Sequence, residues 1–205
     1  MSKIKICGLS RPCDIEYVNE AKPDFCGFII NVPKSKRNVT PDTVRQLVRQ
    51  LSPEVKAVGV FVNAPIAEIV SLVQDGTLSY VQLHGQEDEA YLAQLHDAVS
   101  VPLIQAFQVT CPEDVQRAEA SSADYILLDN GSGVTGKTFD WSHLSGITRP
   151  YILAGGLGPE NLSKAVTQLS PWGVDLSSGV ETGGVKDREK ILAAVQAVRS
   201  VQSSI

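Results

Sequence analysis

The stretch YILAGGLGPENLSKAVTQL, residues 151–169, contains the signals of a strand, a glycine turn and a helix in that order. Residues 151–154 are apolar and end at Gly155-Gly156. Four apolar residues then follow at the i, i+3, i+4, i+7 spacing of an amphipathic helix, namely Leu162, Ala165, Val166 and Leu169. The stretch therefore predicts one strand-plus-helix unit of an α/β fold.

Similar apolar runs recur along the whole chain. We place strands near residues 4–7, 25–30, 56–62, 79–83, 102–106, 124–129, 150–154 and 173–176. Their starts are about 21 to 31 residues apart, which is close to the length of one strand-plus-helix unit. The runs at 56–62 and 124–129 are nearly all apolar, as is typical of parallel strands covered on both faces.

Helical spacing is also clear between these strands, at 44–51 and at 66–73. Pro41, Pro65 and Pro159 stand at the predicted helix starts, where a missing N–H costs nothing. Thr40 is the predicted N-cap ahead of Pro41. Segment 130–148 is the least regular, and its three glycines predict a loop rather than a full helix. These glycines are Gly131, Gly133 and Gly136.

Eight strand-helix units with no linker predict a single (β/α)₈ barrel over residues 1–205. A doubly wound open sheet is the alternative, because alternation of strands and helices does not by itself show closure. In a parallel barrel the carboxyl ends of all strands open onto one face, where active sites are built.

The composition narrows the function classes. A net charge of −5 and a pI near 5.2 argue against nucleic-acid or membrane binding, and we find neither a ~20-residue apolar span nor a signal peptide. The four cysteines form no CxxC pair and the three histidines are scattered, so we expect neither a metal site nor a disulfide framework. Reduced thiols predict a cytoplasmic protein.

Two reactive side chains stand at predicted strand ends. Cys7 follows the run 4–6, and Asp129 closes the run 125–128. A thiol at the mouth of a barrel can serve as a proton acceptor or nucleophile if its pKa is lowered. The alternatives are a buried structural cysteine and a turn-capping aspartate, and the local sequence does not decide between them.

Two further turns have the composition of phosphate sites. Gly155-Gly156 and Ser177-Ser178-Gly179 follow the seventh and eighth predicted strands, where barrels often bind phosphate through backbone N–H groups and short hydroxyls. The basic run 34–37 is either a solvated loop or an anion clamp led by Arg37. His84 and Asp175 either point into the mouth or have structural roles.

With these residues in view, the chain resembles the phosphoribosylanthranilate isomerase family from Lys3 to about Val195. The resemblance rests on blocks that occur in the family's order. They are Lys5-Ile6-Cys7-Gly8, Lys34-Ser35-Lys36-Arg37, Val58-Gly59-Val60-Phe61-Val62-Asn63, Val81-Gln82-Leu83-His84-Gly85, Leu127-Leu128-Asp129, Thr138-Phe139-Asp140-Trp141, Leu153-Ala154-Gly155-Gly156-Leu157 and Val174-Asp175-Leu176-Ser177-Ser178-Gly179-Val180-Glu181.

The resemblance implies a (β/α)₈ barrel and an Amadori rearrangement of N-(5-phosphoribosyl)anthranilate in tryptophan biosynthesis. It implies that Asp129 is the general acid and Cys7 the general base, and that Arg37 holds the anthranilate carboxylate. Both glycine turns would hold the phosphate, and His84 and Asp175 would lie near the substrate. It implies no metal and no organic cofactor. We expect a monomer whose only partner is this phosphosugar substrate.

The chain departs from the family pattern at two places. Val134 stands where a glycine is usual, and the stretch 181–187 lacks the common Pro-Gly. One rival is a histidine-pathway isomerase that uses two aspartates, and Cys7 at the first strand end argues against it. The other is a phosphate-binding barrel that senses a metabolite without converting it, and a turnover assay separates the two.

Overall fold

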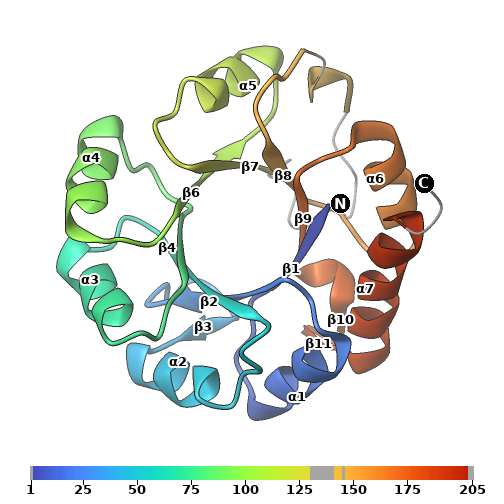
Figure 1. Ribbon diagram of the computed structural model, residues 1–205, viewed down its shortest axis with the longest axis horizontal. Helices are drawn as coiled ribbons and strands as arrows, with labels where there is room; N and C mark the ends of the chain where they lie inside the picture. The colour runs from blue at the N-terminus through green and yellow to red at the C-terminus, as the bar shows by residue number, and fades with distance from the viewer. Residues whose placement is uncertain (1, 130–140, 145, 203–205) are drawn as a thin grey trace.

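Parallel strands close into a barrel in the computed structural model, which describes residues 2–129, 141–144 and 146–202, and helices cover the outside of that barrel (Figure 1). The eight barrel strands are β1 (Lys3–Cys7), β2 (Phe25–Ile30), β4 (Lys56–Phe61), β5 (Tyr80–Leu83), β6 (Leu103–Gln108), β7 (Tyr125–Asp129), β8 (Tyr151–Ala154) and β9 (Gly173–Leu176). β1 pairs with both β2 and β9, so the ring has no free edge. The predicted (β/α)₈ barrel is confirmed and the open sheet is excluded.

Seven α-helices surround the strands in the described part of the chain. They are α1 (Pro12–Ala21), α2 (Pro41–Val48), α3 (Ile66–Gln74), α4 (Glu89–Ala98), α5 (Pro112–Glu119), α6 (Leu162–Leu169) and α7 (Arg188–Gln202). Between β7 and β8 the described residues include a 3₁₀ helix, η1 (Trp141–Leu144). Gly131, Gly133, Val134 and Gly136 lie outside the described residues.

Two of the three predicted helix starts agree with the structure, and the third does not. Thr40 caps α2, because its hydroxyl accepts a hydrogen bond from the Thr43 N–H at 3.2 Å, and Pro41 is the first helical residue. Pro65 is itself the N-cap of α3. Pro159 lies in a turn three residues before α6, so its expected place at the helix start is wrong. Asn161 closes that turn by accepting from the Gly158 N–H, and the helix begins only afterwards.

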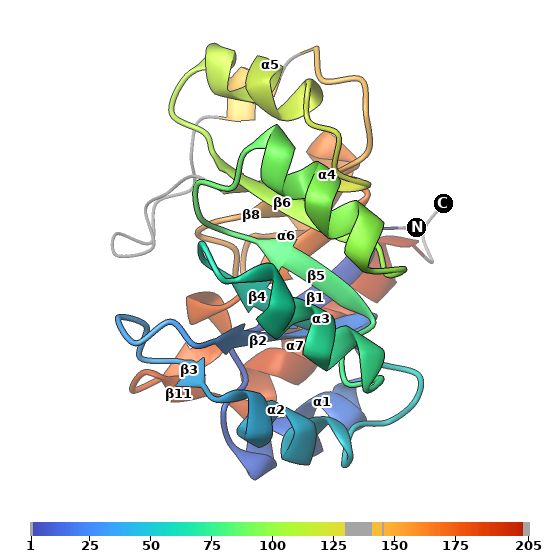
Figure 2. The same ribbon diagram turned by 90° about the vertical axis from the view of Figure 1, so that its left-hand side faces the viewer.

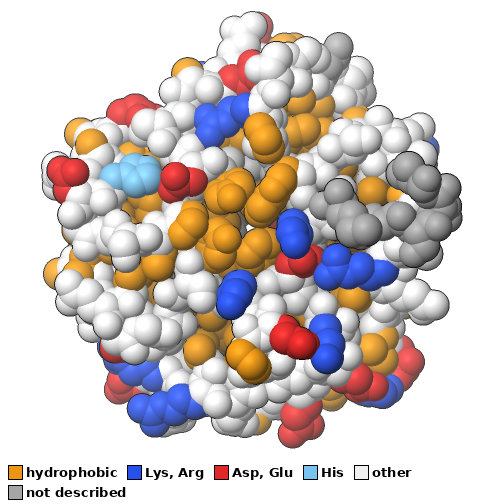
Figure 3. All heavy atoms as spheres, in the orientation of Figure 1, with side chains coloured by type: hydrophobic (Ala, Val, Ile, Leu, Met, Phe, Trp, Pro, Cys, Tyr) orange, Lys and Arg blue, Asp and Glu red, His pale blue; other side chains and the backbone are white. Residues whose placement is uncertain are grey.

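Apolar side chains fill the barrel below the cavity at the carboxyl ends of the strands. Phe25, Val58, Ile104, Leu127, Ile152 and Ala154 form a core inside the ring, separate from the larger core between strands and helices. Aromatic rings pack against it, with the centroids of Tyr125 and Trp172 4.4 Å apart. Figure 3 views the molecule from the amino end of the barrel, and hydrophobic side chains gather there over the barrel axis. Because side chains alternate along a strand, residues two positions beyond this core face the interior at the other end.

Short elements that the sequence analysis did not foresee lie at that other end. β3 (Asn38–Val39) extends the sheet beside β2, and η2 (Ser178–Val180) leads into a hairpin of β10 (Glu181–Thr182) and β11 (Val185–Lys186). Figure 2 shows β3 and β11 at the same end of the barrel. Among the described residues, no helix combines the length and the apolar character needed to cross a membrane.

Candidate active site

A cavity of about 310 Å³ opens at the carboxyl ends of the strands. Nine of the ten site residues expected from the sequence line it, together with apolar side chains from β2 and β4. The nine are Cys7, Arg37, His84, Asp129, Gly155, Gly156, Asp175, Ser177 and Ser178. The strand ends thus bring residues from distant parts of the chain to one hollow, as expected for a parallel barrel.

Cys7 ends β1 with its side chain toward the cavity and is only 6% exposed. A Cβ at Gly27 on β2 would lie 2.8 Å from the Cys7 sulfur, so the absence of a side chain there makes room for the thiol. Burial raises the pKa of Cys7, and the ammonium of Lys5 opposes this effect. Burial therefore favours the neutral thiol over the thiolate in the free protein.

Lys5 is a buried charge that the sequence analysis missed. It lies two residues before Cys7 on the same strand face, and its Nζ is 3.0 Å from both carboxylate oxygens of Asp175 on β9. The Lys5 ammonium is also close enough to the Cys7 thiol for each group to affect the pKa of the other. Burial by itself would lower the pKa of Lys5, but Asp175 and Cys7 outweigh it and the pKa is raised. A fixed positive charge thus lies beside the thiol.

Asp129 ends β7, and one of its carboxylate oxygens lies 3.8 Å from Nε2 of His84. The other ring nitrogen of His84, Nδ1, lies 3.0 Å from the amide nitrogen of Gln82. When that amide donates to Nδ1, the ring proton is on Nε2 and faces Asp129. Gln82 is buried and lines the cavity, and its Oε1 has no hydrogen-bond partner among the described residues. Its only sequence signal was a polar residue inside an apolar strand.

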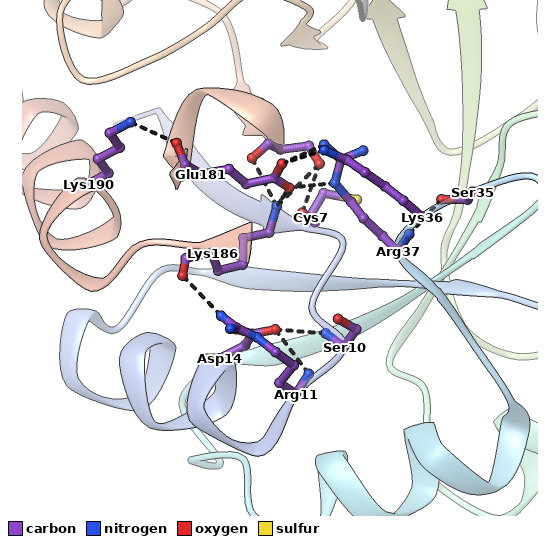
Figure 4. A network of polar contacts seen from close by, with 11 residues as sticks. Cys7, Ser10, Arg11, Asp14, Ser35, Lys36, Arg37, Glu181, Lys186 and Lys190 are labelled. Atoms are coloured by element: carbon purple, nitrogen blue, oxygen red, sulfur yellow. Dashed lines mark hydrogen bonds and ion pairs between the residues drawn. The ribbon is translucent and has the colours of Figure 1, made fainter. Parts of the chain in front are cut away.

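Arg37 reaches the cavity from the loop between β2 and β3, and its Nε and Nη2 donate to the two carboxylate oxygens of Glu181 at 2.5 and 2.9 Å (Figure 4). Gly8 has φ +83°, and a Cβ there would collide with the Arg37 side chain. Burial on its own would raise the pKa of Glu181, but hydrogen bonds from Arg37 and Lys186 lower it to about 2. Glu181 and Lys186 were not expected from the sequence.

The two glycine turns meet beside Cys7. Gly155 and Gly156 both have positive φ, at 86° and 64°, which glycine adopts without strain. Gly179 does not line the cavity, because the space of its missing side chain is taken by the carbonyl of Leu157. Its small size lets the two turns pack together. The Ser177 hydroxyl donates to the carbonyl of Cys7 at 3.1 Å, which connects the second turn to β1.

The cavity brings together side chains that can accept and donate protons. A thiol from β1 and a carboxylate from β7 line it together, with a guanidinium from the loop after β2 and the glycine turns after β8 and β9. Nowhere in residues 2–129, 141–144 and 146–202 do three or more His, Cys, Asp or Glu side chains gather as metal ligands.

Comparison with known proteins identifies the relatives of this barrel. Residues 4–197 match the family model described as N-(5'phosphoribosyl)anthranilate (PRA) isomerase. The chain belongs to this family. The isomerase of Endomicrobium trichonymphae is 44% identical over 205 residues, which cover 98% of this chain and 100% of that protein.

Solved structures of the family have the same fold. A phosphoribosylanthranilate isomerase in complex with reduced 1-(o-carboxyphenylamino)-1-deoxyribulose 5-phosphate has a TM-score of 0.86 at 34% identity, covering 98% of this chain and 100% of the other. Monomers generated from the dimeric isomerase of Thermotoga maritima have a TM-score of 0.85, also at 34% identity, with the same coverage. Membership of the PRA isomerase family was expected from the sequence and is confirmed.

Because the pKa of the Cys7 thiol is raised, we expect it to react more slowly with alkylating reagents than an ordinary cysteine. Because the folded protein holds the thiol above its usual pKa, the thiolate fraction at any given pH is smaller than in the unfolded chain. Alkylation of Cys7 by iodoacetamide should therefore reach half of its maximal rate at a higher pH in the folded than in the urea-unfolded protein. Mass spectrometry of the Cys7 peptide across pH measures both midpoints.

Replacement of Lys5 by methionine serves as the comparison for this titration. It removes the positive charge that opposes the effect of burial, so the folded midpoint should move further up. A folded midpoint at or below that of the unfolded chain would contradict this account of the thiol.

Proposed function

We propose that this protein isomerises N-(5'-phosphoribosyl)anthranilate to 1-(2-carboxyphenylamino)-1-deoxyribulose 5-phosphate, a step of tryptophan biosynthesis, by general acid–base catalysis. The observation that carries the proposal is that Cys7 and Asp129 line one cavity, with Arg37 and the glycine turns in its wall. Such a cavity offers a proton acceptor, a proton donor, a carboxylate clamp and phosphate-sized turns to one substrate.

In this proposal Asp129 in its acid form donates a proton to the furanose ring oxygen. The bond between that oxygen and C1 then breaks, the anthranilate nitrogen shares the resulting positive charge, and a Schiff base forms. Ring opening needs a donor at this atom, and Asp129 is the partly exposed carboxyl group that the cavity provides at the end of β7. The proton on Nε2 of His84 faces the carboxylate that remains after this transfer.

Cys7 first gives its thiol proton to solvent at the open cavity, and the resulting thiolate then removes the proton from C2 of the sugar. The electron pair moves into the C1–C2 bond and neutralises the Schiff base, which gives an enolamine. Protonation at C1 and loss of the enol proton complete the ketone. The ammonium of Lys5 favours the thiolate by its charge, while Asp175 keeps this ammonium in place. Hydrogen moves from C2 to C1 without net oxidation, so the step requires no organic cofactor.

The substrate has two negative ends, and the cavity has a candidate group for each. Arg37 binds the anthranilate carboxylate through its guanidinium. The turns at Gly155-Gly156 and at Ser177-Ser178 bind the phosphate through backbone N–H groups and hydroxyls. The reacting carbons C1 and C2 then lie between Cys7 and Asp129. A family relative has been solved in complex with reduced 1-(o-carboxyphenylamino)-1-deoxyribulose 5-phosphate, a ligand that carries both a carboxylate and a phosphate.

Growth of a tryptophan auxotroph tests the function. A bacterial strain that lacks its phosphoribosylanthranilate isomerase should grow without tryptophan when it expresses this chain. The variant with Cys7 replaced by serine, expressed at the same level, should not restore growth. A well-expressed wild-type protein that fails to restore growth would overturn the isomerase and favour a barrel that only binds phosphosugars.

Replacement of Arg37 by alanine should act on binding. Loss of a charged hydrogen bond to the carboxylate is expected to raise KM by about 10- to 150-fold, which corresponds to roughly 1.5–3 kcal/mol, while kcat changes far less. Steady-state kinetics measure the split. Arg45→Ala is the matched control, because Arg45 pairs with Asp42 and Asp75 outside the cavity. An unchanged KM in the Arg37→Ala protein would count against the clamp.

We further propose that the protein acts as a monomer in the cytoplasm. All four cysteines are free thiols in the structure, which fits a reducing compartment. The relative from Thermotoga maritima is dimeric, so a dimer is the alternative that a mass measurement must exclude. Sedimentation equilibrium at micromolar concentration should give the mass of one chain, 22.0 kDa, and a mass twice as large would refute the monomer.

A further inference from the structure

Glu181 is a buried carboxylate that none of the proposed chemical steps uses. It begins β10, and its side chain is 4% exposed. Three cations surround it, as Figure 4 shows, because Arg37, Lys36 and Lys186 all donate to its two oxygens. A carboxylate is costly to bury without partners, and Glu181 has three cationic partners. Its position beside the cavity residue Arg37 points to a role at the site.

The contact between Glu181 and Arg37 leaves one edge of the guanidinium free to bind a second carboxylate. Glu181 takes the edge formed by Nε and Nη2. A guanidinium carries five N–H donors in one plane, so the edge formed by Nη1 and Nη2 keeps two donors with the spacing of a carboxylate. Since Arg37 lines the cavity, a substrate carboxylate can use this second edge while Glu181 holds the first. Glu181 thereby fixes the plane of the guanidinium before substrate binds.

Lys186 connects this clamp to the phosphate turn. Its side chain is 1% exposed, and its Nζ lies 2.7 Å from Oε1 of Glu181 and 2.9 Å from the carbonyl oxygen of Ser177. One buried ammonium therefore ties the residue that holds Arg37 to the turn that contains Ser177 and Ser178. A chain of hydrogen bonds through Glu181 and Lys186 thus links Arg37 to the turn after β9.

The charges of the cluster favour an anionic ligand. Arg37, Lys36 and Lys186 bring three positive charges to one negative charge on Glu181. The carboxylate orients the guanidinium without cancelling the attraction of the cluster for a second carboxylate. A neutral residue in place of Glu181 would leave more net positive charge but a rotationally free Arg37.

We propose that Glu181, held in place by Lys186, is a positioning residue that aims Arg37 at the substrate carboxylate and fixes its distance from the phosphate turns. It thereby sets the specificity for a phosphosugar that carries an aryl carboxylate. This inference deepens the proposed function and rests on Arg37 as the clamp. It assigns no chemical step to Glu181, which touches Arg37 and not the reacting atoms.

Two inert ligands test the proposal. They are reduced 1-(o-carboxyphenylamino)-1-deoxyribulose 5-phosphate and the same compound without its carboxyl group, and calorimetry measures both dissociation constants. Glu181→Gln should raise the dissociation constant of the carboxylated ligand about tenfold. It should raise that of the decarboxylated ligand less than about twofold. In an Arg37→Ala background, Glu181→Gln should cause no further loss for either ligand, because the effect passes through Arg37.

Control measurements distinguish a loss of binding from a folding defect. Glu181→Gln leaves the buried ammonium of Lys186 without its carboxylate, but the glutamine oxygen can still accept its hydrogen bond, and thermal unfolding of this variant checks that it folds. Glu189→Gln, at an exposed glutamate of α7, is the control and should bind both ligands as the wild type does. Near-normal affinity for the decarboxylated ligand shows that the cavity is intact.

The outcomes separate this inference from the proposed function. Equal weakening of both ligands, or a loss that persists in the Arg37→Ala background, would overturn the positioning role. Neither ligand is converted, so the binding cycle does not depend on turnover. If the wild-type protein does not convert phosphoribosylanthranilate but Glu181→Gln still shows the selective loss through Arg37, the isomerase is overturned and the positioning role of Glu181 is supported.

Discussion

Replacement of Cys7 by serine is expected to lower kcat by about 10²- to 10⁴-fold, the contribution typical of a general base. A serine hydroxyl fills almost the same space, but it does not ionise near neutral pH even beside the ammonium of Lys5. The dissociation constant of the reduced product analogue should stay within about twofold of wild type, because the clamp and the phosphate turns are unchanged.

Steady-state turnover and calorimetry give these two quantities separately. Cys13→Ser is the matched control, since Cys13 lies on α1 outside the cavity, and it should leave kcat unchanged. Turnover within about threefold of wild type in the Cys7→Ser protein would remove Cys7 as the base.

Asp129→Asn should cause a loss of similar size, about 10²- to 10⁴-fold in kcat. Asparagine keeps the shape of the side chain but has no acidic proton to give to the ring oxygen. The loss should fall on kcat and on kcat/KM together, because the interaction is made in the transition state of ring opening. Stopped-flow or steady-state kinetics at several substrate concentrations measure this pattern.

Asp124 provides the control for this variant. It immediately precedes β7, at the opposite end of the barrel, where its carboxylate accepts a hydrogen bond from the Leu103 N–H. Asp124→Asn should therefore lower stability rather than activity. If Asp129→Asn kept its turnover, the acid would have to be another group that lines the cavity.

The barrel was predictable from the sequence because its signals are local. The strands are mostly apolar runs of four to six residues. A helix start can be predicted from neighbouring residues, such as the cap Thr40 followed by Pro41. The strand positions were therefore correct to within one or two residues. The carboxyl ends of parallel strands share one face by geometry, which is why Cys7, Asp129 and both glycine turns could be assigned to the same mouth.

The buried ionic partners were not predictable in this way. Lys5 and Asp175 are 170 residues apart, and Arg37 and Glu181 are 144 apart, so only the closure of the barrel brings them together. Lys5 sits inside an apolar strand and has no local signal of its pairing. Gly179 illustrates the opposite case, since its place in a phosphate-like motif was visible but its packing against the Leu157 carbonyl was not.

The roles of Cys7 and Asp129 as base and acid are the central claim, and one experiment tests them together. Freshly generated phosphoribosylanthranilate is mixed with wild-type protein, with Cys7→Ser and with Asp129→Asn, and the loss of anthranilate-type fluorescence is followed. The account predicts a loss well above the spontaneous background for wild type and near the background for both variants. A loss as fast in either variant as in wild type would contradict the assignment of that residue.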